Sequence, residues 1–135
     1  MANKQIIINQ EDYKKMTLLI RQLKKTHRYN NNKFMRVLAK EMENAHIGDT
    51  NPFAKKYVTL NSKVKYKDLK DGNSYEATIV FPVFADSTKD LYSILSPLGT
   101  ALIGEAVGNI TTCYAPAGEL NLEILEVETP VHRRE

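Results

Sequence analysis

The residue types that most often act in catalysis or bind metals are scattered along this chain, and their spacing argues against a catalytic centre. The three histidines, His27, His46 and His132, lie far apart, and none has a cysteine or carboxylate at the spacing of a zinc ligand set. Ser96 precedes a proline, and the sequence assigns no general base to it. We therefore expect no metal site, no cofactor and no enzymatic activity.

The other candidates for chemistry, one cysteine and a group of glycines, favour structural roles. Cys113 alternates with Thr112 and Tyr114 as in a strand, so we expect it in the core rather than as a reactive thiol. A phosphate-binding loop needs glycines at fixed spacing and a following lysine, which the glycines of residues 99–108 lack.

Residues 91–104 instead have the pattern of a strand, a turn and a short helix. Residues 91–95 are β-competent, and Pro97 cannot donate to a sheet ladder but suits the first position of a helix. Gly104 stands where a left-handed residue would end that helix. We expect Ser96 to lie at an exposed turn between the two elements.

Residues 91–104 form a connector between strands. In the segments around it, apolar and polar residues alternate with a period of two, which is typical of strands. We expect strands over residues 58–67, 75–83, 91–95, 110–114 and 120–127, with a turn at Asp71-Gly72 and a loop over residues 85–90. Five strands and one short helix predict an α+β fold, with an antiparallel sheet in a body that spans residues 55–130.

In the first 50 residues, the apolar side chains recur at the spacing of helices. Asn9 is a good N-cap, and Asp12 could complete a weak capping box. The apolar residues that follow at intervals of three and four are Tyr13, Met16, Ile20 and Leu23. A polar break at residues 27–32 precedes a second amphipathic helix over residues 32–45. We expect a short antiparallel helical hairpin with coiled-coil packing, whose tip carries His27, Arg28, Tyr29 and Lys33.

Charge is divided unevenly along the chain. Residues 1–40 hold ten lysines and arginines against two acidic residues, whereas the remainder is acidic, and the net charge is +3. A basic arm suits an anionic partner, although a solvated lysine-rich helix face has the same composition. With 135 residues, one cysteine and neither a signal-peptide core nor a long apolar run, we expect a cytoplasmic, monomeric protein without a membrane segment.

As a string, the connector resembles a known family. Ser-Pro-Leu-Gly-x-Ala-Leu-Ile-Gly-x-x-Val-Gly over residues 96–108, followed by Pro-Ala-Gly-Glu over 116–119, is similar to the C-terminal domain of the bacterial Gre transcript cleavage factors. The similarity covers residues 57–128. It implies that the body is FKBP-like and binds RNA polymerase, docking through Ser96-Pro97 and an acidic residue of the preceding loop, Asp86 or else Asp90.

The hairpin departs from the cleavage factors. Their longer hairpin carries acidic residues at its tip that hold a catalytic metal, whereas residues 26–33 here contain no carboxylate. The nearest carboxylates, Glu11, Asp12, Glu41 and Glu43, belong to the base of the hairpin. In this respect the chain looks more like the short branch of the family, the regulators of nucleoside diphosphate kinase.

Two functions remain open at this point. One is a non-catalytic transcription regulator that docks on RNA polymerase near its secondary channel through the body and lacks transcript cleavage. The other is a nucleic-acid-binding module whose basic hairpin makes weak phosphate or DNA contacts. Prolyl isomerase activity is not expected, because a fold alone carries no function and the chain has no tryptophan. We also expect residues 55–130 to fold without the hairpin of residues 1–50.

Overall fold

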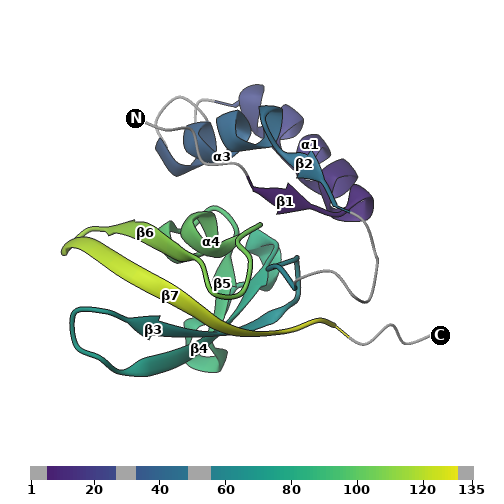
Figure 1. Cartoon of the computed structure of the whole chain (residues 1–135). Helices are drawn as coiled ribbons and strands as arrows, with labels where there is room; N and C mark the ends of the chain where they lie inside the picture. Colours follow the sequence, from purple (N-terminus) through teal and green to yellow (C-terminus); the bar gives the residue numbers. More distant parts are fainter. Residues whose placement is uncertain (1–5, 27–32, 49–55, 131–135) are drawn as a thin grey trace.

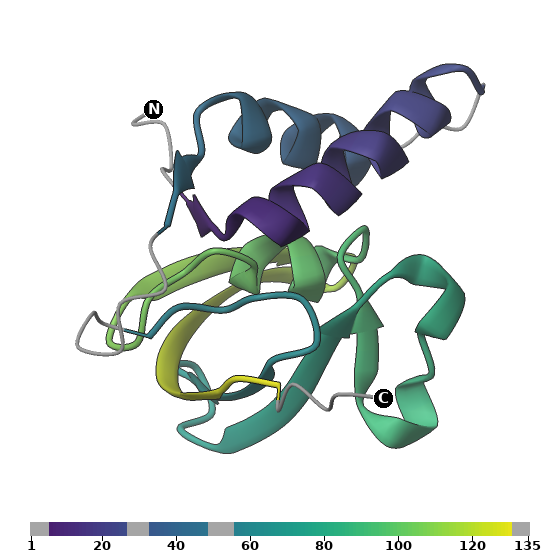
Figure 2. The same cartoon turned by 90° about the vertical axis from the view of Figure 1, so that its right-hand side faces the viewer.

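A computed structural model describes residues 6–26, 33–48 and 56–130 of the chain (Figure 1). A curled five-stranded sheet forms the body, and the short helix α4 (Pro97–Leu102) lies on one of its faces. Two longer helices, α1 (Gln10–Lys24) and α3 (Lys33–Glu43), lie side by side above that face, and α3 contacts α4 (Figures 1 and 2). The mixed α+β class is as predicted.

The start of α1 is fixed by the side chains of Asn9 and Asp12. Asn9 caps the helix as predicted, because its Oδ1 accepts a hydrogen bond of 2.8 Å from the backbone N–H of Asp12. The expected capping box is replaced by a longer-range contact. The Oδ2 atom of Asp12 accepts from Asn9 Nδ2 at 3.1 Å and from the backbone N–H of Leu60, in the body, at 2.9 Å.

A pair of very short strands closes the base of the two helices. β1 (Ile7–Ile8) and β2 (His46–Ile47) pair in parallel, with Ile7 opposite His46. α3 therefore ends at Glu43, before the predicted residue 45, because His46 and Ile47 extend to pair with β1.

Gly104 joins this base to the body. Its carbonyl accepts the N–H of Ile7 at 3.0 Å, and it has the predicted positive φ, +76°. A Cβ at position 104 would lie 2.5 Å from the Cβ of Ile6. Glycine is therefore required both by the backbone conformation and by the close approach of the N-terminal segment.

The body sheet has the strand order β5-β4-β3-β7-β6. Its strands are β3 (Lys63–Asp68), β4 (Ser74–Val80), β5 (Leu91–Ser93), β6 (Ile110–Ala115) and β7 (Gly118–Glu128). All neighbours are antiparallel except β4 and β5, which are parallel, with Thr78 opposite Leu91. The predicted antiparallel sheet is therefore wrong at this edge, because residues 81–90 form a crossover rather than a hairpin loop.

Three strands are shorter than predicted: β5 ends at Ser93 rather than at residue 95, and β3 and β4 are shortened for local reasons. β3 begins at Lys63 because the preceding residues turn: Asn61 has a φ of +68°, and the N–H of Ser62 donates to the carbonyl of Thr59 at 3.1 Å. β4 ends at Val80 because Pro82, which has no N–H for a ladder, opens a 3-10 helix, η1 (Pro82–Phe84).

One apolar cluster connects the helices to the sheet. Its fully buried members include Met16 of α1, Leu38 of α3, Leu102 of α4 and Ile124 of β7. Cys113 also lies in the cluster, as predicted, and burial raises the pKa of its thiol. Because the two parts share this core, removal of residues 1–50 would expose apolar surface on α4. Independent folding of residues 55–130 stays a prediction.

Within residues 6–26, 33–48 and 56–130, none of the helices has both the length and the apolar character needed to cross a bilayer.

Candidate docking site

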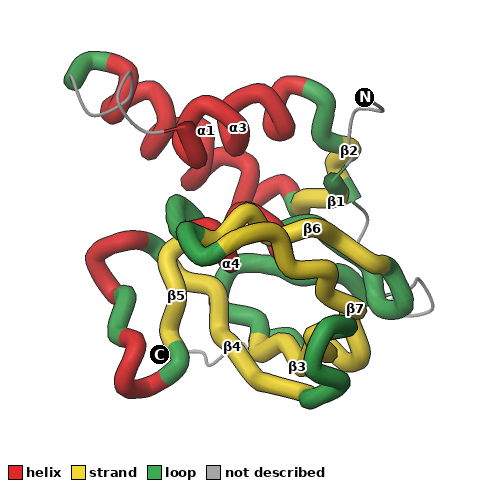
Figure 3. The backbone as a smooth tube through the Cα atoms, turned by 90° about the vertical axis from the view of Figure 1, so that its left-hand side faces the viewer, coloured by secondary structure: helices red, strands yellow, loops and turns green. Residues whose placement is uncertain are grey.

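Both acidic candidates lie in the crossover between the parallel strands β4 and β5 (Figure 3). Residues 81–90 contain η1 and a second 3-10 helix, η2 (Ser87–Lys89), and η1 packs against β5. Val80 lies opposite Ser93, at the end of β5. The crossover therefore leaves the end of β4 beside the end of β5. It then runs back along β5 and enters the sheet again at the start of β5.

Asp86 holds the second half of this crossover. It is the N-cap of η2: its Oδ1 accepts from the N–H of Thr88 at 3.1 Å and from the hydroxyl of Thr88 at 2.6 Å. Its backbone exchanges two hydrogen bonds, of 2.9 and 3.0 Å, with Leu91 at the start of β5. The carboxylate is partly exposed, so one oxygen is used locally while the group still meets solvent.

Asp90 ends η2 in a left-handed conformation, with a φ of +57°. Aspartate tolerates this region better than most residues. Its N–H donates to the carbonyl of Ser87, and its own carbonyl accepts the N–H of Thr78 in β4 at 2.9 Å. The side chain is exposed. Asp90 thus presents a negative charge from a fixed backbone position.

The Ser96-Pro97 step begins α4. Pro97 occupies the first helical position, as predicted, and Ser96 is the N-cap. The hydroxyl of Ser96 accepts from the N–H of Gly99 at 3.0 Å and donates to the carbonyl of Ser93 at 2.7 Å. Both residues are half-buried. The expectation that Ser96 is an exposed turn residue is therefore wrong, because its side chain joins the end of β5 to the start of α4.

Replacing Ser96 with alanine should lower the free energy of unfolding by about 1 kcal/mol, the usual value of an N-cap. The N–H of Gly99 and the carbonyl of Ser93 each lose a partner. Threonine, which keeps the hydroxyl, should recover most of this loss. Urea unfolding of the three proteins measures the effect, and equal stability of Ser96→Ala and wild type would contradict the assigned role.

The four docking candidates lie along one edge strand rather than in one cluster. Asp86 and Asp90 lie at the start of β5, and Ser96 and Pro97 follow its end. β5 has three residues, so the strand itself measures about 10 Å at the usual rise per residue. β5 is also an edge of the sheet. A partner that meets all four candidates must therefore cover this whole edge.

Sequence reasoning missed two residues of the same crossover. Val83 and Phe84, in η1, are 80% and 64% exposed, the highest values among the large hydrophobic residues that the structure describes. Val83 was placed at the end of a predicted strand. Pro82 within that run was the signal that the strand ends earlier and that the next side chains need not follow its alternation.

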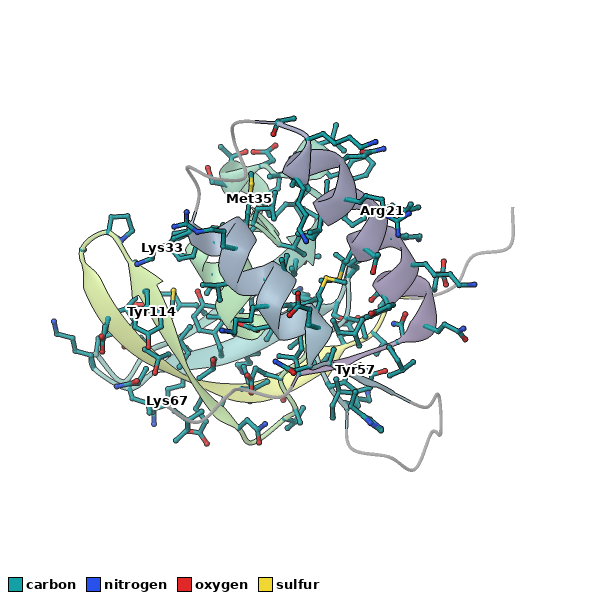
Figure 4. The ribbon with its side chains drawn as sticks, turned by 90° about the horizontal axis from the view of Figure 1, so that it is seen from above. Arg21, Lys33, Met35, Tyr57, Lys67 and Tyr114 are labelled. Carbon is teal, nitrogen blue, oxygen red and sulfur yellow. The ribbon has the colours of Figure 1, made fainter. Side chains whose placement is uncertain are left out.

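The predicted hairpin tip is only partly described. His27, Arg28 and Tyr29 lie outside the described residues. Lys33, the first residue of α3, is exposed, and its Nζ lies 5.8 Å from the ring centroid of Tyr114 in β6 (Figure 4). Lys33 is thus close to the body rather than distant from it.

Glu11 and Asp12, two of the carboxylates at the base of the helices, have different partners. Glu11 is exposed and forms an ion pair of 3.1 Å with Lys15, one turn along α1, whereas Asp12 is buried against Leu60. Within the described ranges, no three His, Cys, Asp or Glu side chains converge as a metal ligand set would.

Comparison with known proteins agrees with the resemblance seen in the sequence. Residues 54–129 match the family described as Transcription elongation factor, GreA/GreB, C-term. The chain is 30% identical over 129 residues to the Regulator of nucleoside diphosphate kinase of Escherichia coli (strain K12), an alignment that covers 95% of this chain and 92% of that protein.

Two further relatives extend the comparison. The chain is 39% identical over 71 residues to Transcription elongation factor GreA of Prosthecochloris aestuarii, covering 53% of this chain and 44% of that one. Among solved structures it is similar to the Prokaryotic transcription elongation factor GreA/GreB from Nitrosomonas europaea, with a TM-score of 0.73 and 27% identity over 93% of this chain and 99% of that chain. The predicted resemblance is thereby confirmed.

Proposed function

Because this chain belongs to the GreA/GreB family of transcription elongation factors, we propose that it is a non-catalytic regulator that binds RNA polymerase. The body of residues 55–130 docks near the secondary channel, and the helices of residues 1–50 point toward its entrance as a short counterpart of the family's hairpin. In this proposal the body is FKBP-like, as the family resemblance implies.

The observation that carries the proposal is the match of residues 54–129 to the family's C-terminal domain. The edge that the resemblance assigns to docking supports it. Asp90 is held in a left-handed backbone position, and Asp86 and Ser96 are held in place because their side-chain oxygens accept hydrogen bonds from nearby backbone N–H groups. A surface whose backbone is fixed before binding loses less conformational entropy on association than a mobile loop does.

The absence of transcript cleavage is part of the proposal. The resemblance places the metal-holding carboxylates of cleavage factors at the hairpin tip, and residues 26–33 of this chain contain none. Of the carboxylates near the start of α1, Asp12 is buried in a structural contact and Glu11 pairs with Lys15. Neither is placed to position a second metal ion for hydrolysis.

Stalled elongation complexes test this directly. Incubated with the protein and magnesium, they should keep their RNA length on a sequencing gel, whereas a cleavage-competent Gre factor shortens the 3′ end. In a mixture, excess protein should slow cleavage by that factor, because both occupy one site. Shortening above the intrinsic rate of the polymerase would contradict the proposal, and unimpeded cleavage by the competitor would contradict the shared site.

The name of the Escherichia coli relative, Regulator of nucleoside diphosphate kinase, fits the same proposal. A polymerase-binding protein changes the level of an enzyme indirectly, through transcription. We therefore propose no direct contact between this chain and a kinase.

A nucleic-acid-binding role is the second candidate, supported by the exposed basic side chains of α1 and α3. These are Lys14, Lys15, Arg21, Lys24, Lys33, Arg36 and Lys40. Binding of this kind is sequence-independent and weakens steeply with salt. A gel-shift titration of the free protein with duplex DNA at two salt concentrations separates it from polymerase binding.

A further inference from the structure

The most unusual surface feature of the body is the pair Val83 and Phe84. Isolated exposed apolar residues are normal on protein surfaces. Here two large apolar side chains are adjacent, and they are 80% and 64% exposed. Exposure of both at once leaves an apolar area in water that a partner could bury.

The backbone that carries this pair is well held. The N–H of Phe84 donates to the carbonyl of Phe81 at 2.9 Å, and the N–H of Ala85 donates to the carbonyl of Pro82 at 3.2 Å. Phe81, just before the turn, packs against the core. The turn therefore anchors one aromatic ring in the body while it directs the next two apolar side chains into solvent.

Val83 and Phe84 lie between the docking candidates at the two ends of β5. The crossover leaves the sheet near the end of β5, where Ser96 follows, and returns to the start of β5 at Asp86. Val83 and Phe84 lie in η1, between those two points, and η1 packs against β5. The pair therefore lies between the acidic end and the Ser-Pro end of the same edge.

The geometry points to Val83 and Phe84 as the apolar anchor of the docking surface, and this inference rests on the proposed function. The partner is a protein surface of RNA polymerase that offers an apolar pocket with basic residues at its rim. Asp86 and Asp90 supply the complementary negative charges beside the pair. Buried aromatic and aliphatic anchors surrounded by a polar rim are the arrangement in which most interface free energy is concentrated.

The test is the equilibrium dissociation constant for core RNA polymerase, measured for the full chain and a Val83→Ser/Phe84→Ser variant. Both side chains are exposed, so the variant should unfold at nearly the wild-type temperature. Loss of a two-residue anchor should raise the dissociation constant about 30-fold. Val83→Ile/Phe84→Leu, which keeps the apolar character, should bind within a few-fold of wild type.

The matched control is Ile110→Ser. Ile110 is 61% exposed but lies on β6, at the opposite edge of the sheet from β5, and its loss should leave the dissociation constant unchanged. If wild type binds polymerase and the double variant binds equally, the anchor is wrong and the proposed function stands. If wild type itself does not bind, both fail. A wild-type dimer in sedimentation that the double variant abolishes would assign the pair to self-association and overturn the inference.

Discussion

Replacing Gly99 with alanine is expected to lower the free energy of unfolding by about 3 kcal/mol, the upper range for overpacking a close-packed site. A Cβ at this position would lie 2.0 Å from the carbonyl oxygen of Ser93 and 2.9 Å from the Cα of Ile94. Both are backbone atoms, so no flexible side chain can move aside. The favourable helix propensity of alanine, about 1 kcal/mol over glycine, is too small to offset this contact.

The steric origin of the effect can be isolated with a second glycine. Gly72 has a φ of +75° and open space where a Cβ would lie, so Gly72→Ala should cost only the left-handed strain, about 1–2 kcal/mol. Chemical denaturation of both variants gives the comparison. The account is contradicted if Gly99→Ala is no less stable than Gly72→Ala. The result matters for docking, because displacement of α4 from β5 would break the Ser96 cap and move the Ser-Pro step.

The second large effect is expected at Asp12, which connects α1 to the body. Asp12→Ala should lower the free energy of unfolding by about 2 kcal/mol, because the buried N–H of Leu60 then has no acceptor. Asp12→Asn should stay close to wild type, since one amide oxygen can accept from Leu60 and Asn9 as Oδ2 does. Glu11→Ala, in the same helical turn, controls for the loss of a charge near the helix N-terminus. A loss at Glu11 as large as that at Asp12 would contradict this role.

The pH dependence of the Asp12 contribution has a defined sign. Burial raises the pKa of this carboxyl above its ordinary value of 3.8, although the bond from Leu60 and the charge of Lys15 oppose the shift and Glu11 adds to it. The folded state therefore binds the proton more tightly than the unfolded state. The stability that comes from this tighter proton binding is full below pH 3.8 and is lost as the pH rises through the raised pKa. The stability of wild type minus that of Asp12→Asn should fall over this range, and a rising difference would contradict the assignment.

Local signals in the sequence predicted the elements that depend on local chemistry. Asn9 caps α1 through its own side chain, and Pro97 occupies the first position of α4. Gly104 adopts a left-handed conformation, as its place at the helix end indicated. In each case the determining contact lies within a few residues, so the pattern contains the necessary information.

Features set by distant contacts could not be predicted in the same way. Asp12 bonds to Leu60, 48 residues away, and no pattern near Asp12 indicates that partner. The parallel pairing of β5 depends on where the crossover returns, which alternation alone does not specify.

The docking role of the candidate residues stays a prediction, and the geometry around them could not be predicted from the sequence. Ser96 was expected at an exposed turn, yet its hydroxyl is bonded to both Ser93 and Gly99. Val83 was expected in a strand, yet it lies in η1 and is the most exposed of the large hydrophobic residues that the structure describes. Exposure depends on what packs over a segment, and sequence alternation reports only which residues share a face.

The central claim, that the body docks on RNA polymerase, is tested most directly by equilibrium binding of the labelled protein to purified core polymerase. Three proteins suffice: wild type, Asp86→Asn/Asp90→Asn, and Arg28→Glu/Lys33→Glu. The asparagine pair keeps the capping oxygen of Asp86 and the left-handed tolerance of Asp90 while it removes both charges. We predict saturable wild-type binding that weakens for the asparagine pair, mainly at low salt, and is unchanged for the glutamate pair. Loss of binding in the glutamate pair alone would contradict the account and place the docking element in the helices.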